Sequence, residues 1–273
     1  MRGKVFVYEH DLANNVWENK FEYIGFAGGG GLEGGEAGAS VSLNGDGTIL
    51  AIGEPTYPDQ KQGETIMRAG KISIIKKDNG TWSNVESDMA VGTHQGQELG
   101  SYVSLNTDGT IIIIGSDDDL GGHSKKDIYE LNNNNTLTLK GSFDLTATGQ
   151  GGDHGGGEGG LVSVFKNIAV DNSGTMVAKV TRTFEGALEG EGAVVTDIKY
   201  DISVFEYING AFIKIGEDIS NIISFDPNNL GESNWGESEM FNGISLSGDG
   251  TTIAVGSLLQ GDHGELKIYR VKE

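Results

Sequence analysis

The sequence predicts an all-β protein, namely a β-propeller of four-stranded antiparallel blades. A strand–turn–strand segment at residues 40–53 recurs at 102–115 and 243–256, with a weaker copy at 167–180. A second hairpin of alternating residues lies between consecutive copies, so each repeat holds four strands. Repeats of this kind are typical of propeller blades; the alternatives are a β-solenoid, which would have shorter and more even repeats, and a sandwich.

The recurring segment has the pattern of a hairpin with a tight turn. Asn44-Gly45-Asp46-Gly47 holds residue types that favour turns, and glycine supplies the left-handed residue of a short loop. The flanking residues alternate with the period of a strand. In the second copy, residues 111–114 are all isoleucine, which predicts a strand buried on both faces.

The two ends of the chain carry incomplete repeats. Residues 5–23 predict a third and fourth strand, and residues 266–271 predict another third strand, so this strand type is present once too often for a simple closed ring. We expect about four or five blades in a closed ring, or a segment of a larger propeller. The predicted single domain has approximate blade limits of 1–35, 36–97, 98–158, 159–238 and 239–273.

The composition excludes some classes of function. The formal net charge of −21 argues against nucleic acid as a partner, because phosphate recognition needs clustered lysine and arginine. The chain has no cysteine, which excludes disulfides, thiolate metal sites and cysteine nucleophiles. The longest aliphatic run is far too short to insert in a membrane. No signal peptide precedes the first predicted strand, so the location is unknown: inside the cell, or outside after removal of a leader.

The repeat resembles one known family. The layout of residues 40–55, with Ala51-Ile52-Gly53-Glu54-Pro55, and Phe241-Asn242-Gly243 before the last copy, looks like the FG-GAP repeats of the integrin α-subunit propeller. This resemblance implies a binding or cell-adhesion role and an extracellular or cell-surface location. It also implies calcium in the first turn of each blade. The outer carboxylates of the calcium motif are missing, however, since Ser42 and Leu50 occupy its first and last positions, so we expect no calcium there.

Long loops on one face of the propeller are where we expect binding. The short turns share one face, and the irregular segments share the other. These segments are 26–39, 54–69, 88–100, 116–124, 146–160, 183–196, 217–240 and 257–264. They carry the candidate ligand-binding residues His94, His123, His154, Trp235 and His263. The histidines could bind a metal or transfer protons, or they could be ordinary exposed loop residues.

An acidic run is the candidate metal site. Asp117-Asp118-Asp119 follows a predicted strand, and Glu98 precedes the same blade. Clusters of carboxylate oxygens bind calcium, so a calcium cofactor is one interpretation, and a solvated acidic loop is the other.

No catalytic motif stands out, and enzyme activity is left uncertain, with a non-enzyme favoured. There is no G-x-S-x-G nucleophile motif, and the glycine runs lack the helix and Lys-Ser/Thr of a phosphate loop. Glu36, Glu98, Glu158 and Glu239 recur before successive blades, which favours a repeat feature over one active site. We therefore expect a non-catalytic binding or adhesion module whose acidic, glycine-rich loops contact a protein or glycan. The alternatives are a carbohydrate-active hydrolase or lyase and a structural repeat of a larger assembly.

Overall fold

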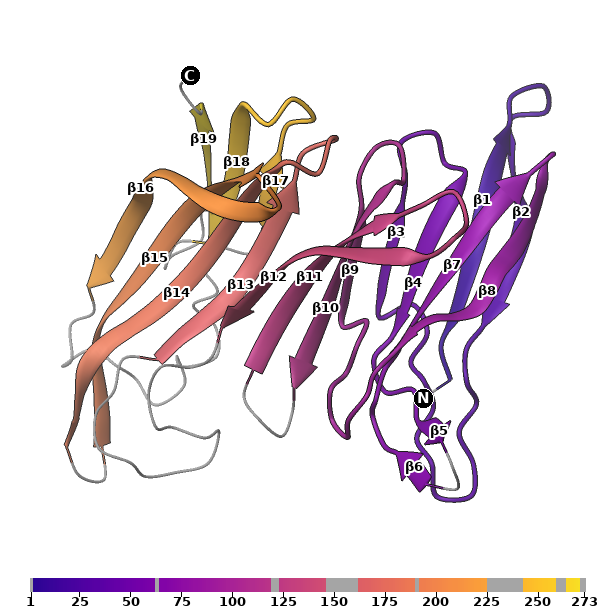
Figure 1. Ribbon diagram of the computed structural model, residues 1–273, viewed down its shortest axis with the longest axis horizontal. Coiled ribbons are helices and arrows are strands. Elements are labelled where there is room, and N and C mark those ends of the chain that lie inside the picture. Colours follow the sequence, from indigo (N-terminus) through magenta and orange to yellow (C-terminus); the bar gives the residue numbers. More distant parts are fainter. Residues whose placement is uncertain are drawn as a thin grey trace. The chain divides into compact units, whose positions relative to one another are not determined.

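The computed structural model describes residues 2–61, 64–118, 123–145, 162–189, 192–224, 243–258 and 264–270. The chain divides into two compact units. Unit 1 is Met1–Gly121 with Lys125–Phe143, and unit 2 is Gly122–Ser124 with Asp144–Glu273. All regular structure in the described residues is β-structure, without a helix (Figure 1).

Unit 1 holds three antiparallel sheets and a small hairpin. One sheet pairs β1 with β2, the second has the order β3-β4-β7-β8, and the third has the order β12-β11-β10-β9. The hairpin β5–β6 is inserted between β4 and β7. The strands are β1 (Lys4–Asp11), β2 (Val16–Ile24), β3 (Ser40–Leu43), β4 (Ile49–Glu54), β5 (Asp59–Lys61), β6 (Glu64–Ile66), β7 (Lys71–Asp78), β8 (Thr81–Val91), β9 (Tyr102–Leu105), β10 (Ile111–Asp118), β11 (His123–Leu131) and β12 (Leu137–Leu145).

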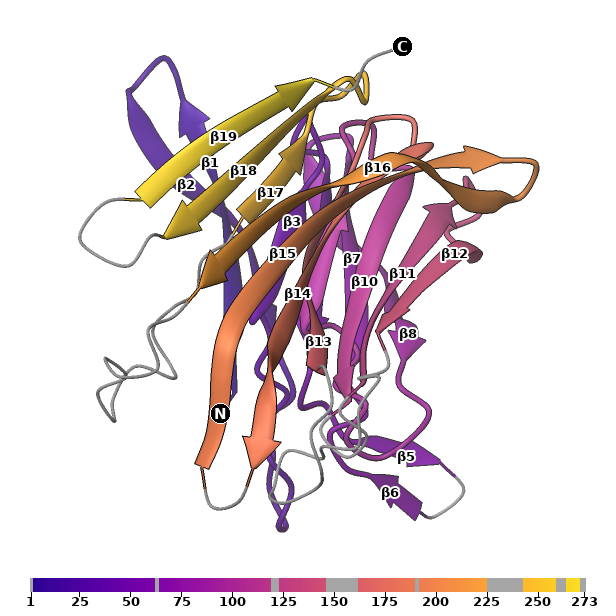
Figure 2. The same ribbon diagram turned by 90° about the vertical axis from the view of Figure 1, so that its left-hand side faces the viewer.

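Unit 2 holds a four-stranded and a three-stranded sheet, with the orders β13-β14-β15-β16 and β17-β18-β19 (Figure 2). Its strands are β13 (Val162–Val170), β14 (Met176–Glu189), β15 (Gly192–Ile208), β16 (Ala211–Ser224), β17 (Gly243–Leu246), β18 (Thr252–Leu258) and β19 (Gly264–Arg270). The predicted irregular loop at 183–196 is wrong, because β14 and β15 continue pairing as far as Glu189 and Gly192.

The predicted fold class is confirmed: the chain is all-β, and its sheets are antiparallel propeller blades whose strands follow one another in sequence order. The number of blades and the limits of each blade stay predictions.

Side-chain alternation packs each blade between its neighbours. In β4, Leu50 and Ile52 join the core with Val7 and Tyr23 of the β1–β2 sheet. Ala51, which lies between them, points to the opposite core, together with Ile112 of β10. Both faces of a blade are therefore buried, which explains why the isoleucine run at residues 111–114 has exposures of only 0–3%. In unit 2 the corresponding core holds Val180, Ile202 and Ile253.

The recurring turn is stabilised by its own side chains. Asn44 Oδ1 accepts the N–H groups of Thr48 and Ile49, at 2.9 and 2.8 Å. Asp46 Oδ1 accepts the N–H and hydroxyl of Thr48. Gly47 has a φ of 69°, in the left-handed region that favours glycine. The turn residues therefore hold the hairpin itself.

The same turns also connect neighbouring blades. In unit 1, Gly45 N–H donates to the carbonyl of Thr107 at 2.7 Å. In unit 2, Asn172 N–H donates to the carbonyl of Gly248 at 3.1 Å, at the equivalent positions of two other copies. The repeated sequence thus encodes both the hairpin and the step from one blade to the next.

Candidate binding surfaces

The predicted metal residues that the structure describes lie in ion pairs. Glu98 Oε1 accepts a hydrogen bond from Arg68 Nε at 2.8 Å. Asp117, at the end of β10, lies 3.3 Å from Lys126 Nζ. Across the described ranges, no three His, Asp or Glu side chains come together in a way that could hold a metal. The calcium site therefore stays a prediction.

The remaining predicted site residues are only partly described. His94 is exposed in the segment between β8 and β9, where its carbonyl accepts the N–H of Gln97 at 3.4 Å. Asp118 and His123 are the last residue of β10 and the first of β11, and their side chains lie outside the described part. Asp119, His154, Trp235 and His263 lie outside the described residues altogether. No common pocket of these residues is therefore established.

The described loops of unit 1 surround a buried carboxylate. Glu54, at the end of β4, is 0% exposed. Its Oε1 lies 3.0 Å from Lys71 Nζ and accepts a hydrogen bond from the Tyr23 hydroxyl at 2.5 Å. Its Oε2 accepts the N–H of Phe26 at 3.0 Å. The carboxylate thus joins β2, β4 and β7 to the segment that follows β2.

The electrostatics of this cluster favour a charged pair. Burial works to lower the pKa of Lys71, but the negative charge of Glu54, that of Tyr23 once its hydroxyl ionises at high pH, and the hydrogen bonds to both outweigh it, so the pKa is raised. Burial, together with the hydrogen bond to Glu54, raises the pKa of Tyr23. Both groups therefore hold their protons at neutral pH. The Lys71 ammonium also lies 4.3 Å from the ring centroid of Tyr57, in a cation–π contact.

Two of the recurring glutamates serve the backbone. Glu36 and Glu98 have positive φ angles of 56° and 51°. The carbonyl of each accepts an N–H three residues later, from Ala39 at 3.0 Å and Ser101 at 3.1 Å. This agreement supports the prediction that they are a repeat feature. It leaves Glu98 as a residue that closes a turn and binds Arg68.

An aromatic sheet face in unit 1 was not predicted from the sequence. Phe6, Tyr8 and Trp17 are 44%, 52% and 68% exposed. The rings of Phe6 and Tyr8 are 6.4 Å apart, and those of His10 and Trp17, which pair across the strands, are 5.1 Å apart. The signal in the sequence is that β1 carries large apolar residues at both alternating sets of positions. We call Phe6, Tyr8, His10 and Trp17 the aromatic face.

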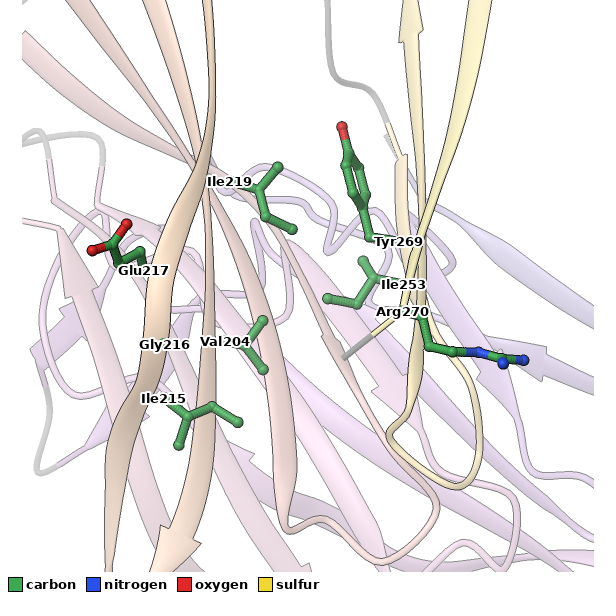
Figure 3. A pocket seen from close by; sticks show the side chains of 8 residues that line it. All are labelled: Val204, Ile215, Gly216, Glu217, Ile219, Ile253, Tyr269 and Arg270. Carbon is green, nitrogen blue, oxygen red and sulfur yellow. The ribbon is translucent and has the colours of Figure 1, made fainter. Parts of the chain in front are cut away.

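Unit 2 contains a groove of about 240 Å³ between its two sheets. Figure 3 shows Val204 and Ile219 directed toward Ile253 and Tyr269 of the opposite sheet, with Glu217 and Arg270 pointing away from the space between them. Ile215 and Gly216 complete the lining. The interior is apolar and the margin is charged, which is the usual character of a site for an apolar side chain.

The described sheets define the class of the protein as a β-propeller module. Similar solved structures include TolB from Acinetobacter baumannii, at 17% identity and a TM-score of 0.39 over 96% of this chain and 45% of that one. The β-propeller domain of the Trilobed protease from Pyrococcus furiosus is 12% identical, with a TM-score of 0.45 over 99% of this chain and 66% of that one. The putative TolB from Agrobacterium tumefaciens is 10% identical, with a TM-score of 0.41 over 100% of this chain and 71% of that one. The chain thus spans 45% and 66% of the first two structures.

The assignment to the FG-GAP family is wrong. No family model matches the chain, and no curated protein matches it. The similar structures named above are TolB proteins and a protease propeller. Part of the resemblance lay in the turn around Asp46, whose carboxylate binds the N–H and hydroxyl of Thr48. Because any tight hairpin can use this local arrangement, the turn indicates a hairpin and does not identify a family.

Among the described residues, no helix is long and apolar enough to cross a membrane.

Proposed function

We propose that this propeller module is non-catalytic and binds a protein partner through the aromatic face of the β1–β2 sheet. The observation that carries the proposal is the exposure of Phe6, Tyr8 and Trp17 on one side of a sheet. Tyrosine, tryptophan and phenylalanine are enriched at protein interfaces, where they supply much of the binding energy. Large apolar patches on a protein surface commonly mark such interaction sites.

The sheet that carries the aromatic face is fixed by a core on its opposite side. On the opposite side of the same sheet, Val7 and Tyr23 are buried in a core with Leu50 and Ile52. The backbone that carries the exposed rings is thus fixed by packing, and little conformational entropy would be lost when a partner binds. Exposed aliphatic residues Leu12, Val16 and Ile24 belong to the same two-stranded sheet and its turn. Their branched side chains suit an apolar protein surface better than a sugar ring.

The hydrolase or lyase alternative gains no specific support. Glu98, the candidate carboxylate that the structure describes in most detail, binds Arg68 and closes a turn. An acid–base pair for glycoside chemistry needs a second carboxyl group at a defined separation.

The proposal is tested by comparing partner capture with three proteins. These are the unmodified chain, the double variant Tyr8→Ser plus Trp17→Ser, and the control Leu139→Ser, which changes a 51% exposed residue of β12. Proteins captured from extracts of the source cells are quantified by mass spectrometry. We expect partners that the unmodified chain and the control retain equally, and that the double variant loses by at least about 10-fold.

Two results would contradict the proposal. One is equal capture by all three proteins. The other is binding to a glycan array that depends on Tyr8 and Trp17, which would replace the protein partner by a carbohydrate. Because the changed side chains are exposed, all variants should melt within a few degrees of the unmodified chain.

A further inference from the structure

The chain contains the dipeptide Asn-Gly four times, at residues 44–45, 79–80, 209–210 and 242–243. This pair can react with itself, because the backbone nitrogen of the glycine can attack the side-chain carbonyl carbon of the asparagine. Glycine has no side chain that would hinder the attack. Asn242, in the fourth pair, lies outside the described residues. The other three pairs are described, and the structure places them in two different environments.

The pair Asn44-Gly45 is held by hydrogen bonds on both of its reacting groups. Asn44 is 6% exposed, and its Oδ1 accepts the N–H groups of Thr48 and Ile49 at 2.9 and 2.8 Å. The Gly45 N–H, whose nitrogen would attack, donates to the carbonyl of Thr107 at 2.7 Å. Bringing this nitrogen to the side-chain carbonyl requires the backbone to rotate, which breaks these hydrogen bonds. The folded blade therefore protects this pair.

The pairs Asn79-Gly80 and Asn209-Gly210 lie in exposed turns. Each pair forms the two-residue turn of a hairpin, the first between β7 and β8 and the second between β15 and β16. The φ angles are 48° at Asn79 and 52° at Asn209, followed by 82° and 89° at the glycines, as in the type I′ turn that favours Asn-Gly. All four residues are exposed, and a Cβ on either glycine would meet no described atom within 4 Å. The attack needs only the end of a hairpin to open, and exposed turns open at low cost.

We infer that Asn79 and Asn209 are sites of spontaneous chemical modification, at which the asparagine loses ammonia and becomes aspartate or isoaspartate. The glycine nitrogen bonds to the side-chain carbonyl carbon, and the bond from that carbon to the amide nitrogen breaks. The amide leaves as ammonia, together with the proton that the glycine nitrogen gives up, and a succinimide ring remains. Water then opens the ring at either carbonyl carbon, which leaves a carboxylate in place of the amide.

The modification changes the hairpin as well as the charge. Opening of the ring at one carbonyl gives aspartate, and opening at the other gives isoaspartate, in which the main chain runs through the side chain and is longer by one methylene. The register of a hairpin depends on the length and type of its turn. Isoaspartate therefore disturbs the pairing of Asp78 with Thr81 and of Ile208 with Ala211, which close the two turns. Each event also adds a negative charge to a chain whose formal net charge is already −21.

The blade β9–β12 provides a natural control. Its turn between β11 and β12 holds Asn135, which has a φ of 59° like the two reactive asparagines. The next residue is Thr136, however, and its branched side chain hinders the attack. Asn135 Oδ1 also accepts a hydrogen bond from Lys76 Nζ at 2.6 Å. We therefore expect Asn135 to remain unmodified.

The test incubates the full chain for several days in mildly alkaline buffer. Peptide mapping by mass spectrometry quantifies aspartate and isoaspartate at each asparagine, and a methyltransferase specific for isoaspartate labels that product separately. In the folded chain, Asn79 and Asn209 should change at least about 10-fold faster than Asn44 and Asn135. In urea, where all the turns are open, Asn44 should change as fast as Asn79 and Asn209, whereas Asn135 should stay slow.

A variant links the modification to the hairpins. Asn79→Gly plus Asn209→Gly removes both reactive amides and keeps residues that tolerate a positive φ. The incubated unmodified chain should melt at a lower temperature than a fresh sample, whereas the variant should melt at the same temperature before and after incubation. Equal rates at Asn44 and Asn79 in the folded chain would overturn the inference. So would rates at Asn79 and Asn209 that do not exceed the rate at Asn135. An equal fall of melting temperature in the variant would contradict the effect on the hairpins.

Discussion

The buried Glu54–Lys71 pair provides the sharpest test of the structure of unit 1. Replacing Glu54 with alanine removes the carboxylate that lies 3.0 Å from Lys71 Nζ and leaves the ammonium in a site where its side chain is 10% exposed. The change also removes the acceptor of the Tyr23 hydroxyl and the Phe26 N–H. Strand β2, strand β7 and the segment that follows β2 therefore each lose a partner in one substitution.

The expected loss of folding free energy is about 3–5 kcal/mol, the usual effect of leaving one member of a buried pair unpaired. An upper limit for the charge itself follows from the proton of Lys71. Its ordinary pKa of about 10.4 lies about 3.4 units above pH 7, and each unit corresponds to about 1.36 kcal/mol, so neutralising it costs about 4.6 kcal/mol. The lost hydrogen bonds add to this cost, whether Lys71 stays charged and unpaired or gives up its proton.

Urea unfolding at pH 7 measures the effect in unit 1 when it is followed by tryptophan fluorescence in a chain with Trp17→Phe and Trp235→Phe, where the buried Trp82 is the remaining tryptophan. The matched control is Glu54→Leu with Lys71→Met, which removes both charges but still takes the acceptor from the Tyr23 hydroxyl and the Phe26 N–H, so it should lose about 1–3 kcal/mol and remain more stable than Glu54→Ala. A loss below about 1 kcal/mol for Glu54→Ala would refute the reasoning. So would a double variant that is as unstable as the single one.

The same pair predicts a dependence on alkaline pH. The pKa values of Lys71 and Tyr23 are both raised in the folded chain, so their stabilising contribution is complete below their ordinary values near pH 10 and is lost as pH rises beyond them. Stability should therefore fall above about pH 10, and the double variant should fall less steeply.

Three further predictions concern the repeat. Gly53→Ala should cost about 1–3 kcal/mol in urea unfolding, since its Cβ would lie 2.0 Å from the carbonyl oxygen of Gly100, whereas Gly256→Ala, with no described atom within 4 Å, should cost little. Hydrogen bonds from Ser247 and Thr251 lower the pKa of Asp249 from 3.8 to about 2, so the stabilisation by this carboxylate is lost as pH falls below about 4. In thermal melts from pH 5 to 2, the melting temperature of Asp249→Asn should therefore fall less than that of the unmodified chain. Ser42→Ala removes the acceptor of an N–H on the next blade at 2.9 Å and should cost about 1 kcal/mol, unlike an exposed serine on the same sheet.

Much of the fold could be predicted because its determinants are local. The turn at Asn44-Gly45-Asp46-Gly47 is fixed by side chains that bind the backbone within five residues, so its sequence marks it wherever it occurs. The four consecutive isoleucines at 111–114 predict, from their composition alone, a strand that is buried on both sides. The extension of β14 and β15 into residues 183–196 was missed because mutual pairing of two strands, and no local turn signal, defines it.

The candidate surfaces were harder to predict, because exposure depends on neighbouring blades. Ile74 of β7 and Ile268 of β19 are both isoleucines at equivalent positions, each paired with the alanine of its second strand. Ile74 is fully buried, whereas Ile268 is 67% exposed. Nothing in the immediate sequence separates the two, so only the strands and sheets packed around them decide which is core and which is surface.

The repeat register explains where the two candidate surfaces occur. The Gly25 N–H donates to the carbonyl of Gly3, and the Gly92 N–H donates in the same way to that of Gly70, so Gly3 and Gly70 are equivalent. Tyr8 and Ile75 lie at the same distance along the chain from these glycines and are therefore counterparts. Ile75 is 0% exposed between sheets, and Tyr8 is 52% exposed on a sheet whose described part has only two strands. The groove likewise lies at the blade whose described part has three strands. In a repeat protein each unit is stabilised mainly by its neighbours, so the same residue type at equivalent positions is core in one blade and surface in another.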